Sequence, residues 1–156
     1  EFQYEEGVVP TYAKKKKKME RYVLGDKLDA ETEHYMNKPI GSRSDQRSKI
    51  WPFKVHHATQ PYDVVNNIII PPLTSGEGGY WTKFNWSYAL EIGAKLSNLP
   101  YSGKFGFAKT KMYWPITHMV TTSKNALTCT DCHSPGGRFN WVELGYKHDP
   151  LQGPEK

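Results

Sequence analysis

Two cysteines and a histidine near the C-terminal end have the spacing of a haem attachment site. Cys129 and Cys132 are the only cysteines among the 156 residues, and His133 directly follows the second one. In a Cys-x-x-Cys-His sequence, each thiol can add to a haem vinyl group to form a thioether, and the histidine can supply an axial nitrogen. The pattern therefore predicts one covalent c-type haem, anchored by Cys129 and Cys132, with His133 as proximal ligand.

Two other functions of a Cys-x-x-Cys pair agree less well with the surrounding sequence. A zinc site that used Cys129, Cys132 and His133 would need a fourth ligand. A thioredoxin-type pair should follow a strand in a β-α-β pattern, and no such pattern is evident before Cys129. Haem attachment accounts for both cysteines and the adjacent histidine together.

Five further histidines exceed what one six-coordinate haem can use. They are His34, His56, His57, His118 and His148. His118 follows a Trp-Pro sequence shortly before the cysteine pair, while His56 and His57 follow Trp-Pro-Phe. Both settings are typical of ordered loops that could present an imidazole to a porphyrin. We therefore predict His118, and one of His56 and His57, as axial ligands, with His34 and His148 as surface residues by default.

The extra ligands would serve irons that this chain does not anchor, because it has a single attachment motif. Those irons would belong to another polypeptide or to a missing part of this one. Met119 is a competing axial ligand that would raise the reduction potential relative to a bis-histidine site. Met112 and Met19 are weaker candidates for the same role.

The composition suggests a chain that relies on its cofactor for part of its core. Hydrophobic residues make up 37% of the sequence and aromatic residues 13%, with 11 prolines and 13 glycines. A haem can supply apolar volume, and aromatic rings pack well on its faces. We therefore expect a mainly α fold with much irregular loop, organised around haem.

The positions of helix caps and prolines predict where the helices lie. We expect helices over residues 12–24, 28–37, 86–98 and 139–146, with Asn85 capping the third. A helical turn from Ser123 should lead into the haem motif, and residues 101–111 should form loop or a short strand. The chain then divides into an N-terminal helical and linker segment, 1–47, and a haem-binding region, 48–156.

Charge and hydropathy limit the possible partners. The net charge is +5, and Lys14 to Lys18 form a continuous run. The run predicts either a solvated face or a docking patch for an acidic redox partner, and not nucleic-acid binding, because no aromatic residues are interleaved. No segment is long and apolar enough to cross a membrane, and no signal peptide is visible. Since haem is normally attached outside the cytoplasmic membrane, we expect a processed chain or a piece of a larger one, in the periplasm or outside the cell.

Several segments resemble the C-terminal region of multihaem cytochromes c, and in particular the octahaem tetrathionate reductase family. These segments are residues 114–120, 126–141, 144–146, 50–56, 60–63 and 99–103. The resemblance covers roughly residues 48–150. It implies closely packed c-type haems, mostly with two histidine ligands, in proteins that reduce small sulfur or nitrogen oxyanions outside the cytoplasmic membrane. It also implies His133 as proximal ligand and His118 and His56 as distal ligands.

These observations predict an electron-transfer subunit, or the C-terminal part, of a multihaem cytochrome complex. The chain would carry one covalent haem and donate axial histidines to neighbouring haems. Alternatively, it would be part of a multihaem oxidoreductase that reduces tetrathionate, nitrite or hydroxylamine. The expected partners are other multihaem cytochrome chains or redox proteins, in an oligomer or complex. No catalytic residue is assigned, because the family places its catalytic haem outside the matching region.

Overall fold

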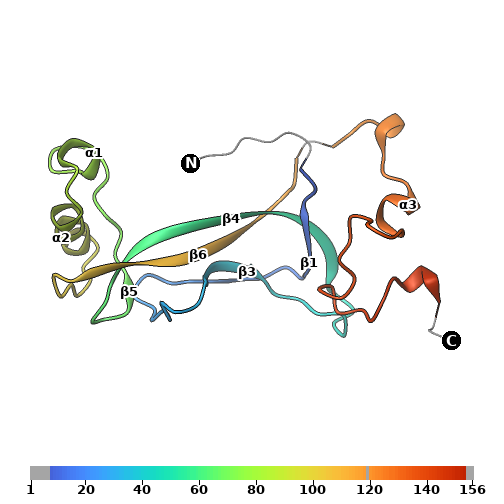
Figure 1. The fold of residues 1–156 in the computed structure, drawn as a ribbon, viewed down its shortest axis with the longest axis horizontal. Coiled ribbons are helices and arrows are strands. Elements are labelled where there is room, and N and C mark those ends of the chain that lie inside the picture. The colour runs from blue at the N-terminus through green and yellow to red at the C-terminus, as the bar shows by residue number, and fades with distance from the viewer. Residues whose placement is uncertain (1–7, 119, 154–156) are drawn as a thin grey trace. The chain divides into compact units, whose positions relative to one another are not determined.

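The computed structural model describes residues 8–118 and 120–153 (Figure 1). The strands are β1 (Thr11–Lys15), β2 (Met19–Arg21), β3 (His34–Pro39), β4 (Lys49–Asp63), β5 (Ile68–Ile69) and β6 (Phe105–Pro115). The helices are α1 (Tyr80–Lys83), α2 (Trp86–Leu96) and α3 (Cys129–Cys132), and the 3-10 turns are η1 (Ser123–Asn125) and η2 (Pro150–Gln152). Met119, which we predicted as a competing ligand, lies outside the described residues.

The expectation of a mainly α fold is wrong. Of the residues that the structure describes, only 17% are helical, whereas 30% are in strands that form a mixed sheet. Residues 12–24 contain most of β1 and all of β2, residues 28–37 contain most of β3, and residues 139–146 form turns. Lysine, alanine and methionine are good helix formers, but helix propensity is a small energy per residue, so pairing with a distant strand overrides it.

The sheet has the hydrogen-bonded strand order β1-β4-β6-β3-β2, with β5 paired to β4. Strand β1 runs antiparallel to β4, with Thr11 opposite Phe53 and Lys15 opposite Lys49. Strand β5 is also antiparallel to β4, whereas β3 runs parallel to β6 with a register shift between Tyr35 and Asn37. The sheet is therefore mixed, and the lysine run that we expected on a helix begins on a strand.

The chain forms two compact units that interleave along the sequence. The first comprises the described residues of Glu1–Glu20, Lys38–Val55 and Tyr113–Lys156, and the second comprises Arg21–Asn37 and His56–Met112. Strands β2, β3, β4 and β6 each contribute residues to both units. The division at residue 47 that the composition suggested stays a prediction.

Helix α2 covers the core of the second unit. The Asn85 side chain accepts a hydrogen bond from the Tyr88 amide at 3.1 Å, which confirms the predicted cap. The buried face of the helix packs in a cluster of Ile68, Ile70, Leu90 and Ala94. A second cluster joins Leu28, Ile69 and Ala108. Burial of these aliphatic side chains removes apolar surface from water and stabilises the unit.

The first unit carries less aliphatic core and more aromatic contact. Phe53 on β4 is fully buried and meets the Tyr113 ring edge-on at 5.7 Å. The ring centroids of Tyr12 on β1 and Phe139 lie 4.5 Å apart, and Leu144 is buried. The first of these contacts joins β4 to β6, and the second joins the C-terminal segment, whose α3 belongs to the same unit, to β1.

None of the helices among the described residues is both long enough and apolar enough to cross a membrane.

Candidate haem-binding site

The two cysteines lie on one short helical turn, α3, whose N-terminus is capped. The Thr128 amide and hydroxyl both donate to the Asp131 carboxylate at 2.7 Å. This is a capping box, with a carboxylate three residues after the cap residue. Because Cys129 and Cys132 are three residues apart on one turn, their side chains leave the same face of α3. The Thr-x-x-Asp spacing is visible in the sequence, although we did not use it to predict this turn.

His133 directly follows α3, and two contacts hold its imidazole. Its Nδ1 lies 2.6 Å from Oδ1 of Asp149, and its ring stacks on Trp141 with centroids 4.8 Å apart and planes 25° apart. A carboxylate only accepts hydrogen bonds, so Nδ1 carries the proton and donates it. Nε2 is therefore the nitrogen whose lone pair can bind a metal.

The carboxylates at this site remain ionised through their hydrogen bonds. Burial alone would raise the pKa of Asp149, but bonds from His133 and the Leu151 amide outweigh it and hold that pKa below its ordinary value. The Thr128 amide and hydroxyl lower the pKa of Asp131. Burial, followed by the nearby Asp131 charge, raises the pKa of the Cys132 thiol. As a free thiol, Cys132 is therefore protonated at neutral pH.

An aromatic cluster extends from the histidine toward β1. Trp141 meets Phe139 at 5.0 Å and Tyr146 at 5.4 Å, both edge-on. The Tyr146 hydroxyl accepts a hydrogen bond from Lys14 Nζ at 3.0 Å, and the Arg43 guanidinium lies 4.6 Å from the centre of the Tyr146 ring. The aromatic content of the sequence predicted an aromatic environment for haem, but not these particular contacts.

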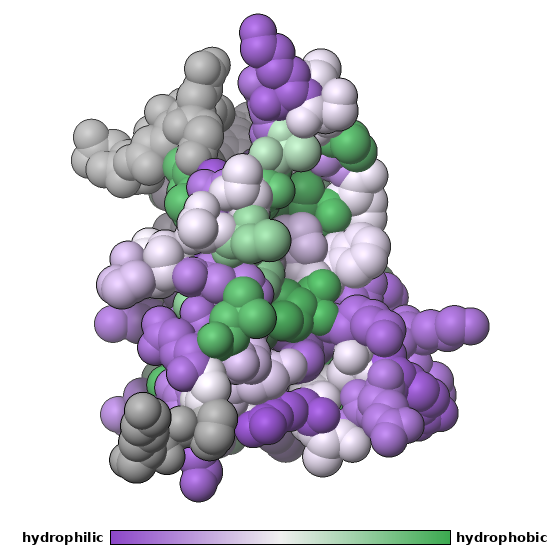
Figure 2. Space-filling model, turned by 90° about the vertical axis from the view of Figure 1, so that its right-hand side faces the viewer, coloured by the Kyte–Doolittle hydropathy of each residue, from purple (hydrophilic) through white to green (hydrophobic). Residues whose placement is uncertain are grey.

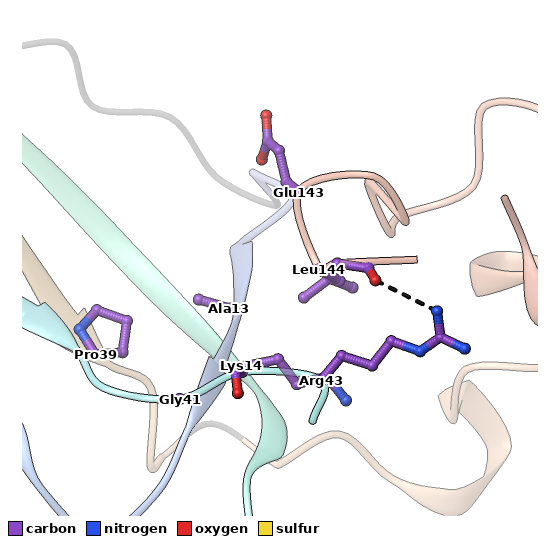
Figure 3. Close-up of a pocket in the computed structure, with 9 residues that line it drawn as sticks. Ala13, Lys14, Pro39, Gly41, Arg43, Glu143 and Leu144 are labelled. Atoms are coloured by element: carbon purple, nitrogen blue, oxygen red, sulfur yellow. Dashed lines mark hydrogen bonds between the residues drawn. The ribbon is translucent and has the colours of Figure 1, made fainter. Parts of the chain in front are cut away.

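Arg43 also connects the loop after β3 to the C-terminal segment. Its Nη1 donates to the Gly145 carbonyl at 3.5 Å, and both residues line a cavity of about 310 Å³ (Figure 3). Gly41 lines the same cavity, and a Cβ there would lie 2.6 Å from the Lys14 carbonyl oxygen. Only glycine allows this close approach of the two backbones.

The surface of the first unit has features that a porphyrin would cover. Four large hydrophobic side chains in its C-terminal part are exposed, namely Val120, Leu127, Val142 and Leu151. Figure 2 views the side on which α3 lies in Figure 1, and hydrophobic groups are interspersed there with hydrophilic ones. Trp141 Nε1 and Asp149 Oδ2 are buried without a hydrogen-bond partner in the part of the chain that the structure describes. The paired thiols, the oriented imidazole and this exposed apolar surface fit a covalent haem.

The remaining histidines occupy varied environments. His118 is exposed in the segment after β6, and His148 Nδ1 lies 3.0 Å from the Asp149 carbonyl oxygen. His34 on β3 meets the Tyr22 ring edge-on at 5.4 Å. Across residues 8–118 and 120–153, no three His, Cys, Asp or Glu side chains are grouped so that they could hold a metal ion. The axial roles of these histidines stay predictions.

His56 and His57 are successive residues of β4 and not of a loop. Successive side chains of a strand point to opposite faces. The two imidazoles therefore cannot both bind the iron of a porphyrin from the same side. His57 Nδ1 lies 2.5 Å from a Glu33 oxygen, and the other oxygen of Glu33 pairs with Lys111 at 3.0 Å. Hydrogen bonds from His57 and then Lys111 lower the pKa of Glu33. Glu33 therefore remains ionised and can accept a hydrogen bond from Nδ1–H of His57.

The lysine run contributes to a cationic cavity in the first unit. Lys16, Lys17, Lys18 and Arg47 line a cavity of about 580 Å³. Asp45 lies 3.5 Å from Lys16 Nζ and 3.4 Å from Arg47 Nε. Asp45 therefore pairs with two of these four cations, and the described lining keeps an excess of positive charge.

A comparison of the sequence with protein-family models identifies the family. The model described as bacterial cytochrome c matches residues 1–136. The chain belongs to this family. Its cofactor is therefore covalently bound haem c, and its functional class is electron transfer. No curated protein matches this cytochrome.

A solved structure extends the comparison to the fold. The crystal structure of octaheme cytochrome c from Shewanella oneidensis is similar to this cytochrome, with 40% sequence identity and a TM-score of 0.89. The match covers 94% of this chain and 35% of the Shewanella chain. The cytochrome thus spans about a third of the length of this relative. The predicted resemblance to a multihaem cytochrome c is confirmed.

Proposed function

We propose that Cys129 and Cys132 form the two thioether bonds to a haem and that His133 Nε2 is an axial ligand of its iron. The observation that carries this proposal is the hydrogen bond from His133 Nδ1 to Asp149, next to a capped turn that bears both thiols. This bond selects the tautomer in which Nε2 is available. It is formed by the protein alone, so the ligand is oriented in advance.

The haem supplies a one-electron couple between ferric and ferrous iron. The chain's own residues hold and shield it. Thr128 and Asp131 hold the turn that presents the thiols, and Trp141 limits rotation of the imidazole. The exposed apolar side chains of the first unit would exclude water from the porphyrin. A fixed position matters because tunnelling rate depends mainly on the distance between redox centres.

We further propose that the cytochrome works within a multihaem assembly outside the cytoplasmic membrane. The similarity to about a third of an octaheme cytochrome c supports this, since the chain itself has one attachment motif. His118 and one of His56 and His57 would then be ligands of neighbouring haems. The opposite directions of the last two side chains agree with only one of them facing a given porphyrin. Redox proteins or other cytochrome chains would be the partners, and oxyanion reduction by the whole assembly stays a prediction from the resemblance.

Substitution of each ligand in the holoprotein tests the proposal. Replacing both cysteines with serine should remove one covalent haem per chain, measured by mass spectrometry and by the reduced absorption spectrum. His133→Ala should leave that haem attached but convert it from low spin to high spin, as seen by electron paramagnetic resonance. His34→Ala is the matched control and should change neither signal. An unchanged low-spin spectrum in His133→Ala would exclude His133 as the ligand.

The same spectroscopic test applies to the distal ligands. His118→Ala should convert one haem of the assembly to high spin, and only one of His56→Ala and His57→Ala should do so. If both β4 variants keep all haems low spin, neither histidine is a ligand.

A further inference from the structure

The carboxylate of Asp149 lies where it can change the electronic properties of His133. Its side chain is only 6% exposed, and the distance of 2.6 Å between Oδ1 and Nδ1 is typical of a short, charge-assisted hydrogen bond. The two residues are 16 positions apart. The bond is therefore a product of folding and not of the attachment motif itself.

The C-terminal segment holds this carboxylate in place. Asp149 caps the 3-10 turn η2, where the Leu151 amide donates to Oδ1 at 3.0 Å and the Gln152 amide donates to the Asp149 carbonyl at 3.0 Å. On the other side, Trp141 stacks on the imidazole. Each partner of the bond is thus held by further contacts of its own, which keeps the Asp149 carboxylate within hydrogen-bonding distance of the imidazole.

We propose that Asp149 is a positioning residue that lowers the reduction potential of the haem bound at His133. This inference rests on the proposed role of His133 as axial ligand. When Nδ1–H donates to a carboxylate, the imidazole gains anionic character and Nε2 becomes a stronger electron donor. Stronger donation stabilises ferric iron more than ferrous iron, so the potential falls. Only the strength of the ligand changes, and no proton leaves the pair.

The isosteric change Asp149→Asn separates this electronic role from a purely structural one. The asparagine side-chain oxygen can still accept from Nδ1 and from the Leu151 amide, so the ring and η2 keep their supports. The full negative charge next to Nδ1 is lost. A residue that only holds the ring in place would leave the potential unchanged in this variant.

The experiment is a potentiometric titration of the holoprotein, followed by absorbance in the haem bands. In Asp149→Asn, one component of the titration should shift to a more positive potential, while the other components stay where they are. Glu143→Gln is the matched control, because it removes one exposed negative charge from the same segment and leaves the contacts of His133 with Asp149 and Trp141 in place. A shift in Asp149→Asn no larger than in Glu143→Gln would overturn the inference.

A second measurement covers the case in which Asp149→Asn does not accumulate as holoprotein. In the reduced wild type labelled with 15N-histidine, the His133 Nδ1 proton should give a downfield resonance that exchanges slowly with water. A rapidly exchanging or absent Nδ1 proton would overturn the inference. These outcomes can be told apart from a failure of the proposed function. If His133 is not a ligand, His133→Ala will leave every haem low spin.

Discussion

Asp63→Asn should destabilise the second unit by about 3 kcal/mol, because one buried carboxylate holds two loops together. Asp63 ends β4 and has no exposed side-chain surface. Its Oδ1 accepts from the Val65 amide at 2.9 Å, the Asn66 amide at 2.8 Å and the Ser102 hydroxyl at 3.0 Å. Its Oδ2 accepts from the Ser102 amide.

The magnitude follows from what an asparagine side chain can replace. Hydrogen bonds to a charged acceptor each contribute about 1.5–3 kcal/mol, and a buried donor left without a partner costs a similar amount. Asparagine keeps one oxygen for the bonds now made to Oδ1. Its amide group would then face the Ser102 amide, donor against donor. The loss of one hydrogen bond, together with the weakening of the other three when their acceptor loses its charge, gives about 3 kcal/mol. This is on the order of 100-fold in the folded-to-unfolded ratio.

Chemical denaturation followed by tryptophan fluorescence measures this loss, since Trp86 packs in the same unit. Glu77→Gln is a suitable control, because Glu77 is an exposed acid of that unit. A free energy of unfolding for Asp63→Asn within about 0.5 kcal/mol of the wild type would refute the reasoning. It would mean that solvent or local rearrangement satisfies these donors.

The same carboxylate predicts the direction of a pH effect. Burial alone would raise the pKa of Asp63, but hydrogen bonds from Ser102, Asn66 and Val65 outweigh it and lower that pKa. Its contribution to stability is therefore fully present above the unfolded-state pKa of about 3.9, and is lost as the pH falls through the lower folded-state value. Asp63→Asn should flatten this part of the stability profile.

Three other changes test separate parts of the structure. Gly93→Ala should cost about 2–3 kcal/mol in thermal unfolding, because its Cβ would lie 1.9 Å from the Pro71 carbonyl oxygen and α2 would have to move. Thr128→Ala removes the cap of α3 and should destabilise that turn by about 1 kcal/mol, measured as a lower yield of covalent haem per polypeptide. Changing Lys17 and Lys18 to glutamate should slow association with an acidic electron donor at low salt, and stopped-flow measurements should show the difference disappear at high ionic strength.

Local signals in the sequence were reliable where structure depends on neighbouring residues. Asn85 and Pro100 bracket α2 as predicted, since capping and helix termination act within one turn. The helical turn predicted from Ser123 is present, but it ends at Asn125, and Ala126 is already extended before the haem motif. The helix predicted over residues 12–24 was wrong. Strand β1, which covers the start of this range, pairs with β4 far along the chain, and helix propensity contains no information about such pairing.

The sequence by itself determined the chemistry of the cofactor, because two thiols and an imidazole at this spacing match the vinyl groups and iron of one haem. It did not determine the surroundings of that motif. Only the tertiary structure decided that Asp149 meets Nδ1 of His133, that Trp141 stacks on its ring, and that His56 and His57 point to opposite faces of a strand. These arrangements arise from contacts between distant segments and from strand pairing, which depend on the packing of the whole chain and not on the spacing of neighbouring residues.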